Sequence, residues 1–322
     1  MLCLLVLGGC KNELNEIGKE VQISEQQSQT ATSNFLTTKD EVKVVNGRLV
    51  FANQEAYNRI VAQLANMTEN EMNTWENTIG FSSLRTYNIS NIASQVLSNI
   101  PPNYQTLLNT KGEYQIDTSI IWFNSDGYAY IIENADEKLL KKLRSNPKNS
   151  SVRKMSFGIK NIPIKKTSDG LITANATIPG GSIDARYQYQ YNYGGITYKM
   201  VFEVFSYVQP ALGPYGWGYA NDLYTAVKLE YRKNNGTWAT AGETSTKTIA
   251  GRSYYITCAG ETFSGGYFGG TVSTAGQGYY VRLNSYSVAS SSPASWNVSI
   301  DGRYYENVPI HNQTYVVDPA TW

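Results

Sequence analysis

The feature that most constrains this fold is an alternation of tyrosine with polar residues along residues 187–193. Every second residue there is a tyrosine, and in an extended strand such residues lie on one face. After Gly194-Gly195 the alternation resumes over 196–204, where apolar residues occupy every second position. Two alternating runs joined by two glycines are typical of a β-hairpin.

The rest of the C-terminal half carries the same strand signals. Apolar residues alternate over 223–231, and Asn235-Gly236 supplies a turn. They alternate again over 296–300, before a turn predicted at Asp301-Gly302 and a further strand. Residues 171–322 hold 19 of the 25 tyrosines and 18 of the 27 glycines, with no helical period between the strands. We therefore predict an all-β antiparallel sandwich there, of Ig-like or jelly-roll type.

Residues 39–150 have the pattern of a small α+β domain. Thr68 and Glu71 form a capping box, which begins a helix that ends at Gly80. The other predicted elements are a hairpin with an Asn46-Gly47 turn, a helix at 57–67, strands at 114–123 and 128–132, and a short helix capped by Asn134. The predicted fold is therefore an α+β domain followed by an all-β domain.

The first ten residues, MLCLLVLGGC, are a short apolar run that ends in Cys10. They resemble the lipobox of bacterial lipoproteins, in which a signal peptidase cuts before the cysteine and the cysteine is acylated. The resemblance implies that residues 1–9 are a signal peptide remnant and that Cys10 carries the lipid. The run cannot span a bilayer, which needs about 20 apolar residues. No positive residue precedes Cys10, so we expect the true start codon to lie upstream of Met1.

Composition also predicts the connecting segments. Residues 10–38 form a tether that begins at the lipidated cysteine and is too rich in Ser, Thr and Gln to fold alone. Residues 151–170 form a basic linker. Ten Lys and Arg and no Asp or Glu lie between Lys138 and Lys166, in a chain whose net charge is +1. We interpret this run as a solvated helix end and linker, with contact to anionic lipopolysaccharide or an acidic polysaccharide as the alternative.

Three segments resemble an uncharacterised family of Bacteroidota surface lipoproteins, and they read VNGRLVF (45–51), WENTIGFSSL (75–84) and KGEYQIDTSIIWFNSDGYAYII (111–132). YKMVFEVFSY (198–207) extends the likeness. The resemblance implies a lipobox, a tether, a small α+β domain and a Tyr-rich β-domain. Lys11, next to the predicted anchor, is compatible with the outer membrane and exposure at the cell surface. The shared segments are structural and supply no catalytic residue.

The inventory of reactive side chains is small. His311 is the only histidine, and Cys258 is the only cysteine outside the predicted signal and anchor. Cys258 shares a strand face with Ile256, which favours a place in the core over a nucleophilic role. No HExxH, paired-cysteine or EF-hand pattern is present, so we predict no catalytic residues, no metal and no cofactor. Gly265 to Gly270 lacks the residues of a phosphate loop and is predicted to be a plain loop.

Residues 209–221 carry the strongest ligand-binding signal. Proline and glycine recur there and predict a loop, while Tyr215, Trp217 and Tyr219 alternate among them. Flat rings on a rigid loop suit contact with sugar faces or apolar side chains. We predict these three residues to be candidate ligand contacts. The alternative is that their rings fold back and plug one end of the sandwich.

The sequence thus predicts a non-catalytic, lipid-anchored protein of the bacterial outer membrane whose β-domain binds a polysaccharide or a protein. A structural envelope or assembly subunit is the first alternative. A polysaccharide-acting hydrolase is the second, because nine carboxylates in residues 171–322 leave room for a converging pair. The expected membrane contact is the lipid on Cys10, and nucleic acid is not an expected partner of an exterior protein.

Overall fold

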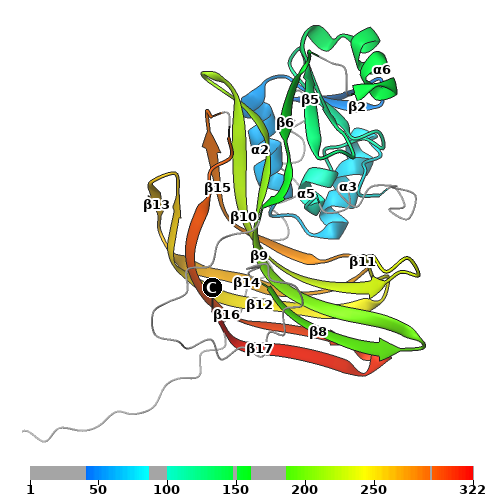
Figure 1. The fold of residues 1–322 in the computed structure, drawn as a ribbon, viewed down its shortest axis with the longest axis vertical. Helices are drawn as coiled ribbons and strands as arrows, with labels where there is room; N and C mark the ends of the chain where they lie inside the picture. The colour runs from blue at the N-terminus through cyan, green and yellow to red at the C-terminus, as the bar shows by residue number, and fades with distance from the viewer. Residues whose placement is uncertain (1–40, 87–99, 148–150, 161–185, 291, 322) are drawn as a thin grey trace, which may run out of the picture. The chain divides into compact units, whose positions relative to one another are not determined.

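The computed structural model describes most of the chain, namely residues 41–86, 100–147, 151–160, 186–290 and 292–321 (Figure 1). Residues Lys39–Trp322 group into one compact unit. This unit is mostly β, with antiparallel sheets and few helices. The predicted signal residues, the lipidation of Cys10, the tether and much of the predicted linker fall outside the described residues.

The N-terminal part of the unit is built on a six-stranded sheet whose strands lie in chain order. Neighbouring strands are antiparallel, except that β2 and β3 are parallel. The strands are β1 (Val42–Val45), β2 (Arg48–Phe51), β3 (Glu113–Ile116), β4 (Ser119–Phe123), β5 (Tyr128–Ile132) and β6 (Arg153–Ser156). The helices are α2 (Gln54–Leu64), α3 (Glu69–Ile79), α5 (Pro102–Gln105) and α6 (Glu137–Ser145), with a 3-10 turn, η3 (Glu133–Ala135).

Local sequence signals explain where several of these elements begin and end. Asn46 and Gly47 both have positive φ and form the predicted turn between β1 and β2. At the start of α3, the Thr68 hydroxyl accepts a hydrogen bond from the N–H of Glu71, and the Glu71 carboxylate accepts one from the N–H of Thr68. Gly80 ends α3 in the left-handed conformation. These predictions are confirmed.

Two predicted elements of the N-terminal part are wrong in detail. The strand predicted at 114–123 is a pair, β3 and β4, because Asp117 adopts a φ of 50° and turns the chain. The cap of α6 is Asp136, whose side chain accepts from the N–H groups of Lys138 and Leu139. Asn134 lies instead in η3 with a positive φ, and residue type alone does not separate two good capping residues so close together.

The C-terminal part consists of two antiparallel sheets. The first contains β7 (Gly158–Lys160), β8 (Arg186–Tyr193), β9 (Ile196–Gly213), β10 (Gly216–Arg232), β11 (Trp238–Thr240) and β15 (Tyr279–Val288). The second contains β12 (Thr244–Cys258), β13 (Glu261–Phe263), β14 (Gly266–Ala275), β16 (Trp296–Val308) and β17 (Gln313–Thr321), with a 3-10 turn, η5 (Pro309–His311), before β17. The predicted hairpin around Gly194-Gly195 is confirmed, since Tyr193 pairs with Ile196.

The two sheets share a hydrophobic core. Phe202 and Val227 of the first sheet pack with Ile249 and Tyr304 of the second. Burying an apolar side chain of this size stabilises the fold by about 2 kcal/mol relative to leaving it in water. Cys258 is buried in a neighbouring cluster of the same core, as its position on β12 predicts.

The predicted loop at 209–221 is wrong, because β9 and β10 continue through it and turn only at Pro214-Tyr215. β7 pairs with β9 only as far as Val208, so Pro210 lies where β9 has a neighbour on one side. A proline is tolerated at such an edge because no partner strand needs its missing N–H. The long hairpin reaches from the C-terminal part to α2, β5 and β6 of the N-terminal part (Figure 1).

Two further predictions, a loop at residues 265–270 and a turn at Asp301-Gly302, are also wrong. Residues 265–270 belong largely to β14, and Asp301-Gly302 lies inside the continuous strand β16. Gly302 pairs with Gly251 of β12, and a Cβ at Gly302 would lie 3.0 Å from the Gly251 Cα. These glycines permit a close approach of two strands and do not mark a turn.

A buried seam joins the N-terminal part to the β9–β10 hairpin. We use this name for Tyr57, Tyr104, Tyr207, Asp222 and Tyr224. The Tyr104 hydroxyl donates to the Asp222 carboxylate, and the Tyr224 hydroxyl donates to Asn103 at 3.2 Å. Gln209 donates to the Tyr57 hydroxyl at 2.9 Å. The two predicted domains therefore pack as parts of one compact unit.

None of the helices in the described ranges is long and apolar enough to cross a membrane.

Candidate functional site

The structure does not bring the three predicted rings of the hairpin to the surface together. Tyr215, at the turn, is 91% exposed, whereas Tyr219 is only 4% exposed. Trp217 is partly buried, and it packs with Tyr219 against Ile131 and Met155 of β5 and β6. The three rings are therefore not exposed together, because this end of the hairpin packs on the N-terminal sheet, and ligand contact by these residues stays a prediction.

Tyr215 and Tyr219 line a depression of about 830 Å³ beside Gln54 and Asp117. Gln54 accepts a hydrogen bond from the N–H of Leu212 at 3.2 Å, so its side chain fixes the hairpin to the start of α2. Only one ring is available to a ligand in this depression.

His311 and Cys258 lie in different side-chain clusters. The His311 ring lies 4.1 Å from the Tyr193 ring and 4.4 Å from the Tyr198 ring, between centroids, and its Nδ1 is 2.8 Å from the Tyr191 hydroxyl. Burial lowers the pKa of His311, although Glu243 opposes that shift. Burial raises the pKa of the Cys258 thiol to about 11, so a thiolate is disfavoured.

Buried and half-buried carboxylates of the β-sheets pair with cations and hydroxyls. Lys228 pairs with Glu203, Lys199 pairs with Glu230 at 2.7 Å, and Ser245 donates to Glu306 at 2.9 Å. Burial raises the pKa of Glu306 to about 7, with Lys247 opposing the shift. Each of these three carboxylates therefore already has a lysine or serine partner within the sheets.

In the parts of the chain that the structure describes, no three or more His, Cys, Asp or Glu side chains converge as a metal site would need.

A different set of exposed rings lies on the outer face of the second C-terminal sheet. We call this the Arg252 face, and it comprises Arg252, Tyr254, Tyr267 and Asp301. Strand register places Arg252 of β12 directly between Tyr267 of β14 and Asp301 of β16. Tyr254 lies on β12 two residues beyond Arg252. Tyr267 is 85% exposed and Tyr254 is 53% exposed.

The side chains of the Arg252 face hold one another in place. The Arg252 guanidinium lies 5.1 Å from the centroid of the Tyr254 ring and 5.3 Å from that of Tyr267. Cations in this position are attracted by the ring faces. The Tyr254 hydroxyl donates to the Asp301 carboxylate at 2.5 Å, and this bond raises the pKa of Tyr254. The two rings are thus oriented before any ligand arrives.

Small residues make the floor of this face. A depression of about 620 Å³ is lined by Ala250, Gly251 and Gly269 together with the four residues of the Arg252 face. Gly269 has a φ of 116°, and a Cβ there would lie 2.0 Å from the Ile249 carbonyl oxygen. A larger residue at Gly269 is therefore excluded by the strand pairing itself, so no side chain rises from β14 at this position beside Tyr267.

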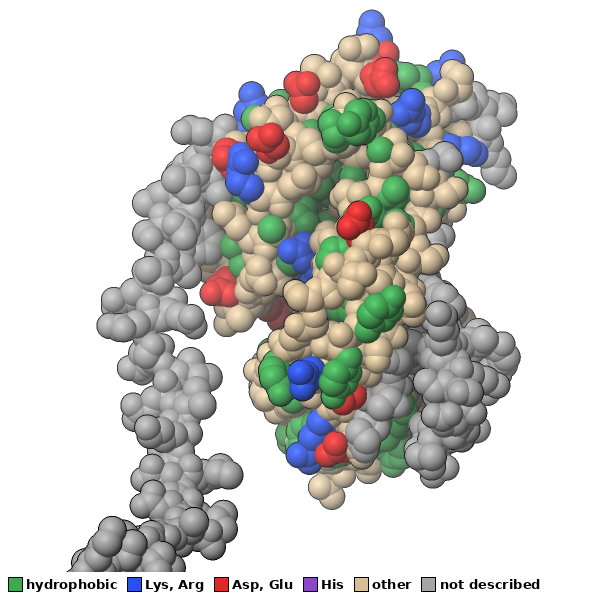
Figure 2. Space-filling model, turned by 90° about the vertical axis from the view of Figure 1, so that its left-hand side faces the viewer, with side chains coloured by type: hydrophobic (Ala, Val, Ile, Leu, Met, Phe, Trp, Pro, Cys, Tyr) green, Lys and Arg blue, Asp and Glu red, His purple; other side chains and the backbone are tan. Residues whose placement is uncertain are grey.

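The arrangement suits a polar ligand that also presents flat apolar faces. Tyrosine rings bury such a face, while a guanidinium, a carboxylate and hydroxyls form hydrogen bonds at its edges. On the side of the molecule drawn in Figure 2, hydrophobic side chains form separate groups among polar and charged ones. A wide apolar protein-docking surface is not what this side presents.

Reasoning from the sequence missed the Arg252 face. Arg252 and Tyr254 alternate in a strand-like segment, which was an available signal. Tyr267 was assigned to a loop, so nothing in the linear pattern placed it beside Arg252.

Comparison with known proteins adds little. No protein-family model matches the chain. No curated protein matches it. It is similar to a solved structure of a DUF4848 family protein from Bacteroides thetaiotaomicron, with 13% sequence identity over 88% of this chain and 100% of that chain. The TM-score is 0.21, and a likeness at that level carries no argument about fold or activity.

Proposed function

We propose that this chain is a non-catalytic lipoprotein of the bacterial outer membrane that binds a glycan at the cell surface through the Arg252 face. The lipid is carried by Cys10, and the two C-terminal sheets form a sandwich that presents the site. The family is the uncharacterised group of Bacteroidota lipoproteins that the N-terminal segments resemble.

One observation carries the binding proposal. Tyr254 and Tyr267 are exposed rings on one sheet face, held on either side of a guanidinium above a floor of alanine and glycine. Burying a ring of this size against a ligand would contribute about 2 kcal/mol to binding. The two exposed rings are therefore available for contact with a ligand. The anchor proposal is supported by the apolar run that ends in Gly9-Cys10.

Affinity electrophoresis tests the binding proposal. The mature chain is run through gels that contain soluble polysaccharides of different backbone chemistry, namely amylopectin, xylan, polygalacturonate and a purified bacterial lipopolysaccharide. We expect retardation by at least one polymer. The Tyr267→Ala variant should lose that retardation, while the matched variant Tyr215→Ala should keep it, because Tyr215 is an equally exposed ring outside the Arg252 face.

Two results would contradict the proposal. Retardation by none of the polymers would remove the glycan as ligand. Retardation that survives in Tyr267→Ala and Tyr254→Ala proteins would move binding away from the Arg252 face. The anchor is tested separately by labelling cells with a fatty-acid analogue, where Cys10→Ser should abolish incorporation into the protein.

A further inference from the structure

A second hollow lies on the other side of β14 from the Arg252 face. It is a cleft of about 450 Å³ between the N-terminal part and the strands β14 and β15. Its walls come from the turn between α2 and α3, from the start of α5 and from the β14–β15 connection. We call it the α3 cleft.

The α3 cleft and the Arg252 face meet at one place on β14. Gly269, Gly270 and Thr271 line both the cleft and the depression of the Arg252 face. At the two glycines the strand itself has no side chains, and the Tyr279 hydroxyl lies beside Gly270, 2.9 Å from where a Cβ would be. Gly270 lies three residues from Tyr267 along the strand, which is about 10 Å.

The free edge of β14 offers hydrogen-bonding groups at this crossing. Among the described strands, β14 pairs only with β12, so its other edge has no strand partner. An unpaired strand edge presents alternating N–H and C=O groups. A sugar chain that crosses the edge there meets backbone donors and acceptors that its hydroxyls match.

The inner wall of the cleft is polar and aromatic. Tyr224, Tyr280 and Arg282 line it. Arg282 lies 3.8 Å from the buried carboxylate of Asp222, which fixes the guanidinium at the wall. Tyr224 is only 2% exposed, so Tyr280 and Arg282 are the side chains that this wall offers to a ligand.

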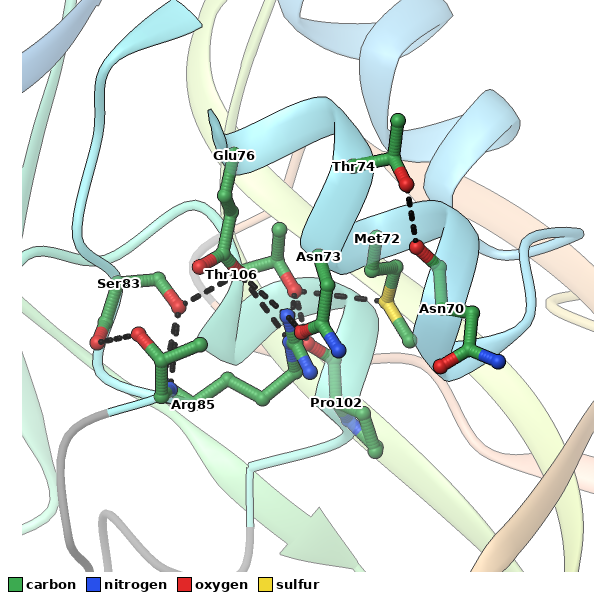
Figure 3. A network of polar contacts seen from close by, with 10 residues as sticks. Asn70, Met72, Asn73, Thr74, Glu76, Ser83, Arg85, Pro102 and Thr106 are labelled. Carbon is green, nitrogen blue, oxygen red and sulfur yellow. Dashed lines mark hydrogen bonds and ion pairs between the residues drawn. The ribbon is translucent and has the colours of Figure 1, made fainter. Parts of the chain in front are cut away.

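A buried polar network holds the opposite wall rigid. Arg85 donates to Glu76 of α3 at 2.7 Å and to the Thr106 hydroxyl at 3.1 Å (Figure 3). Thr106 in turn donates to the carbonyl of Pro102 at 2.8 Å. The network therefore fixes α5 against α3, and Met72 and Pro102, which lie in the same network, line the cleft.

The mouth of the cleft is bridged, which argues against an added peptide strand as its occupant. Thr274 of β14 donates to Glu69 at the start of α3 at 3.0 Å. A peptide that extended the sheet would need β14 open along its length. The bridge at Thr274 leaves instead a short pocket beside Gly269 and Gly270.

From these contacts we infer that the α3 cleft is a second subsite for the same ligand, which receives the end of a sugar chain that lies across the Arg252 face and passes over β14 at Gly269-Gly270. The inference rests on the proposed glycan binding. It adds that the ligand is an oligosaccharide long enough to occupy both hollows, and that chain ends are bound in preference to chain interiors.

Calorimetric titration with sugars of graded length tests the inference. The probes are maltooligosaccharides, xylooligosaccharides and oligogalacturonides, chosen to match the polymer that retards the protein. Affinity should rise with length until both hollows are filled and then stay constant. The variant Asn66→Trp places a ring at the exposed rim of the cleft, and we expect it to bind the long sugars about tenfold more weakly while binding the shortest ones as the unmodified protein does.

A matched variant controls for the added tryptophan. Asn58→Trp introduces the same ring on the exposed surface of α2, away from the α3 cleft, and should bind every length normally. If Asn66→Trp also binds every length normally while Tyr267→Ala does not bind, the glycan-binding function stands and the second subsite is overturned. If Tyr267→Ala binds every length normally, the proposed function itself fails.

Stoichiometry gives a second readout that does not depend on any variant. A protein that binds chain ends should saturate at one molecule per available end, whatever the length of the polymer. Saturation that grows in proportion to polymer length would show binding to chain interiors and would overturn the inference.

Discussion

Two regions of this protein are rich in tyrosine, and they use it in opposite ways. In the seam, Tyr104, Tyr207 and Tyr224 are buried, and burial raises the pKa of each hydroxyl well above its ordinary value. On the Arg252 face, Tyr254 and Tyr267 stand mostly in water. The amino-acid composition does not distinguish the buried tyrosines from the exposed ones.

The difference arises from what lies against each strand face. Helix α5 lies against the β9–β10 hairpin at the seam, where the Tyr104 ring packs on the Tyr207 ring at 4.9 Å between centroids. At the Arg252 face, the two rings contact Arg252 and Asp301 of their own sheet. A tyrosine therefore packs in the interior where another element covers its sheet face, and it is available to a ligand where none does. The following substitutions test that distinction.

Removing the carboxylate at the seam should have the largest effect. The change Asp222→Ala leaves Arg282 beside a site that has lost its charge and takes away the acceptor of the Tyr104 hydroxyl. Breaking a buried pair of this kind costs about 4 kcal/mol. Urea denaturation followed by tryptophan fluorescence measures the loss.

The control for the seam is an exposed pair. Arg303 and Asp318 lie 3.4 Å apart with side chains more than half exposed. Asp318→Ala should change stability by less than about 0.5 kcal/mol. Equal losses of stability in the two variants would show that Asp222 in the seam contributes no more to the free energy of unfolding than the exposed Asp318 does.

A pH series separates a buried acid of β16, Glu306, from an exposed acid of β17, Asp318. Burial raises the pKa of Glu306 in β16 to about 7, and the nearby groups that influence it are Lys247, Ser245 and Glu230. A group whose pKa is raised by folding stabilises the protein below its ordinary pKa, and that contribution is lost as the pH rises through the folded value. The protein should thus lose up to about 3 kcal/mol between pH 4.5 and 7 from this group.

The pH effect is checked by denaturation at several pH values. In Glu306→Gln the slope over this range should be much flatter, because the variant side chain does not titrate. In Asp318→Asn the slope should match that of the unmodified protein, since that carboxylate is exposed. A Glu306→Gln protein with an unchanged slope would contradict a buried, protonated Glu306.

The same contrast explains what could be predicted from the sequence. The capping box at Thr68, the Gly194-Gly195 turn and the tyrosine stripe of β8 are local signals, and the structure confirms the elements they predict. Proline and glycine within 209–221 misled the prediction, because their effect depends on whether a partner strand lies beside them. That information is not local.

The Arg252 face could not be predicted from the sequence for a related reason. Its three strands β12, β14 and β16 are separated along the chain by β13 and β15, and only their register brings Tyr267, Arg252 and Asp301 into one row. At Tyr219 the sequence predicted a ring available to a ligand, but β5 and β6 cover that ring in the structure.

A methyl group added between β12 and β14 should have an intermediate effect. A Cβ at Gly251 would lie 2.4 Å from the Phe268 ring and 2.7 Å from the Asp301 carbonyl oxygen. The backbone oxygen cannot move without disturbing the strand pairing, so Gly251→Ala should destabilise the protein by about 2 kcal/mol. It should also weaken glycan retardation, because the floor of the Arg252 face moves. Gly242→Ala is the matched control, since a Cβ there meets nothing within 4 Å.

The smallest effect on stability is expected where the effect on binding is largest. Tyr267→Ala removes a ring that is 85% exposed, so the free energy of unfolding should stay within about 0.5 kcal/mol of the original value. The same variant should lose its retardation by polysaccharide in the gel. A clear loss of stability would mean that Tyr267 holds β14 in place as the seam tyrosines hold the hairpin. The contrast between covered and uncovered tyrosines would then fail, and the exposed ring would no longer point to a ligand.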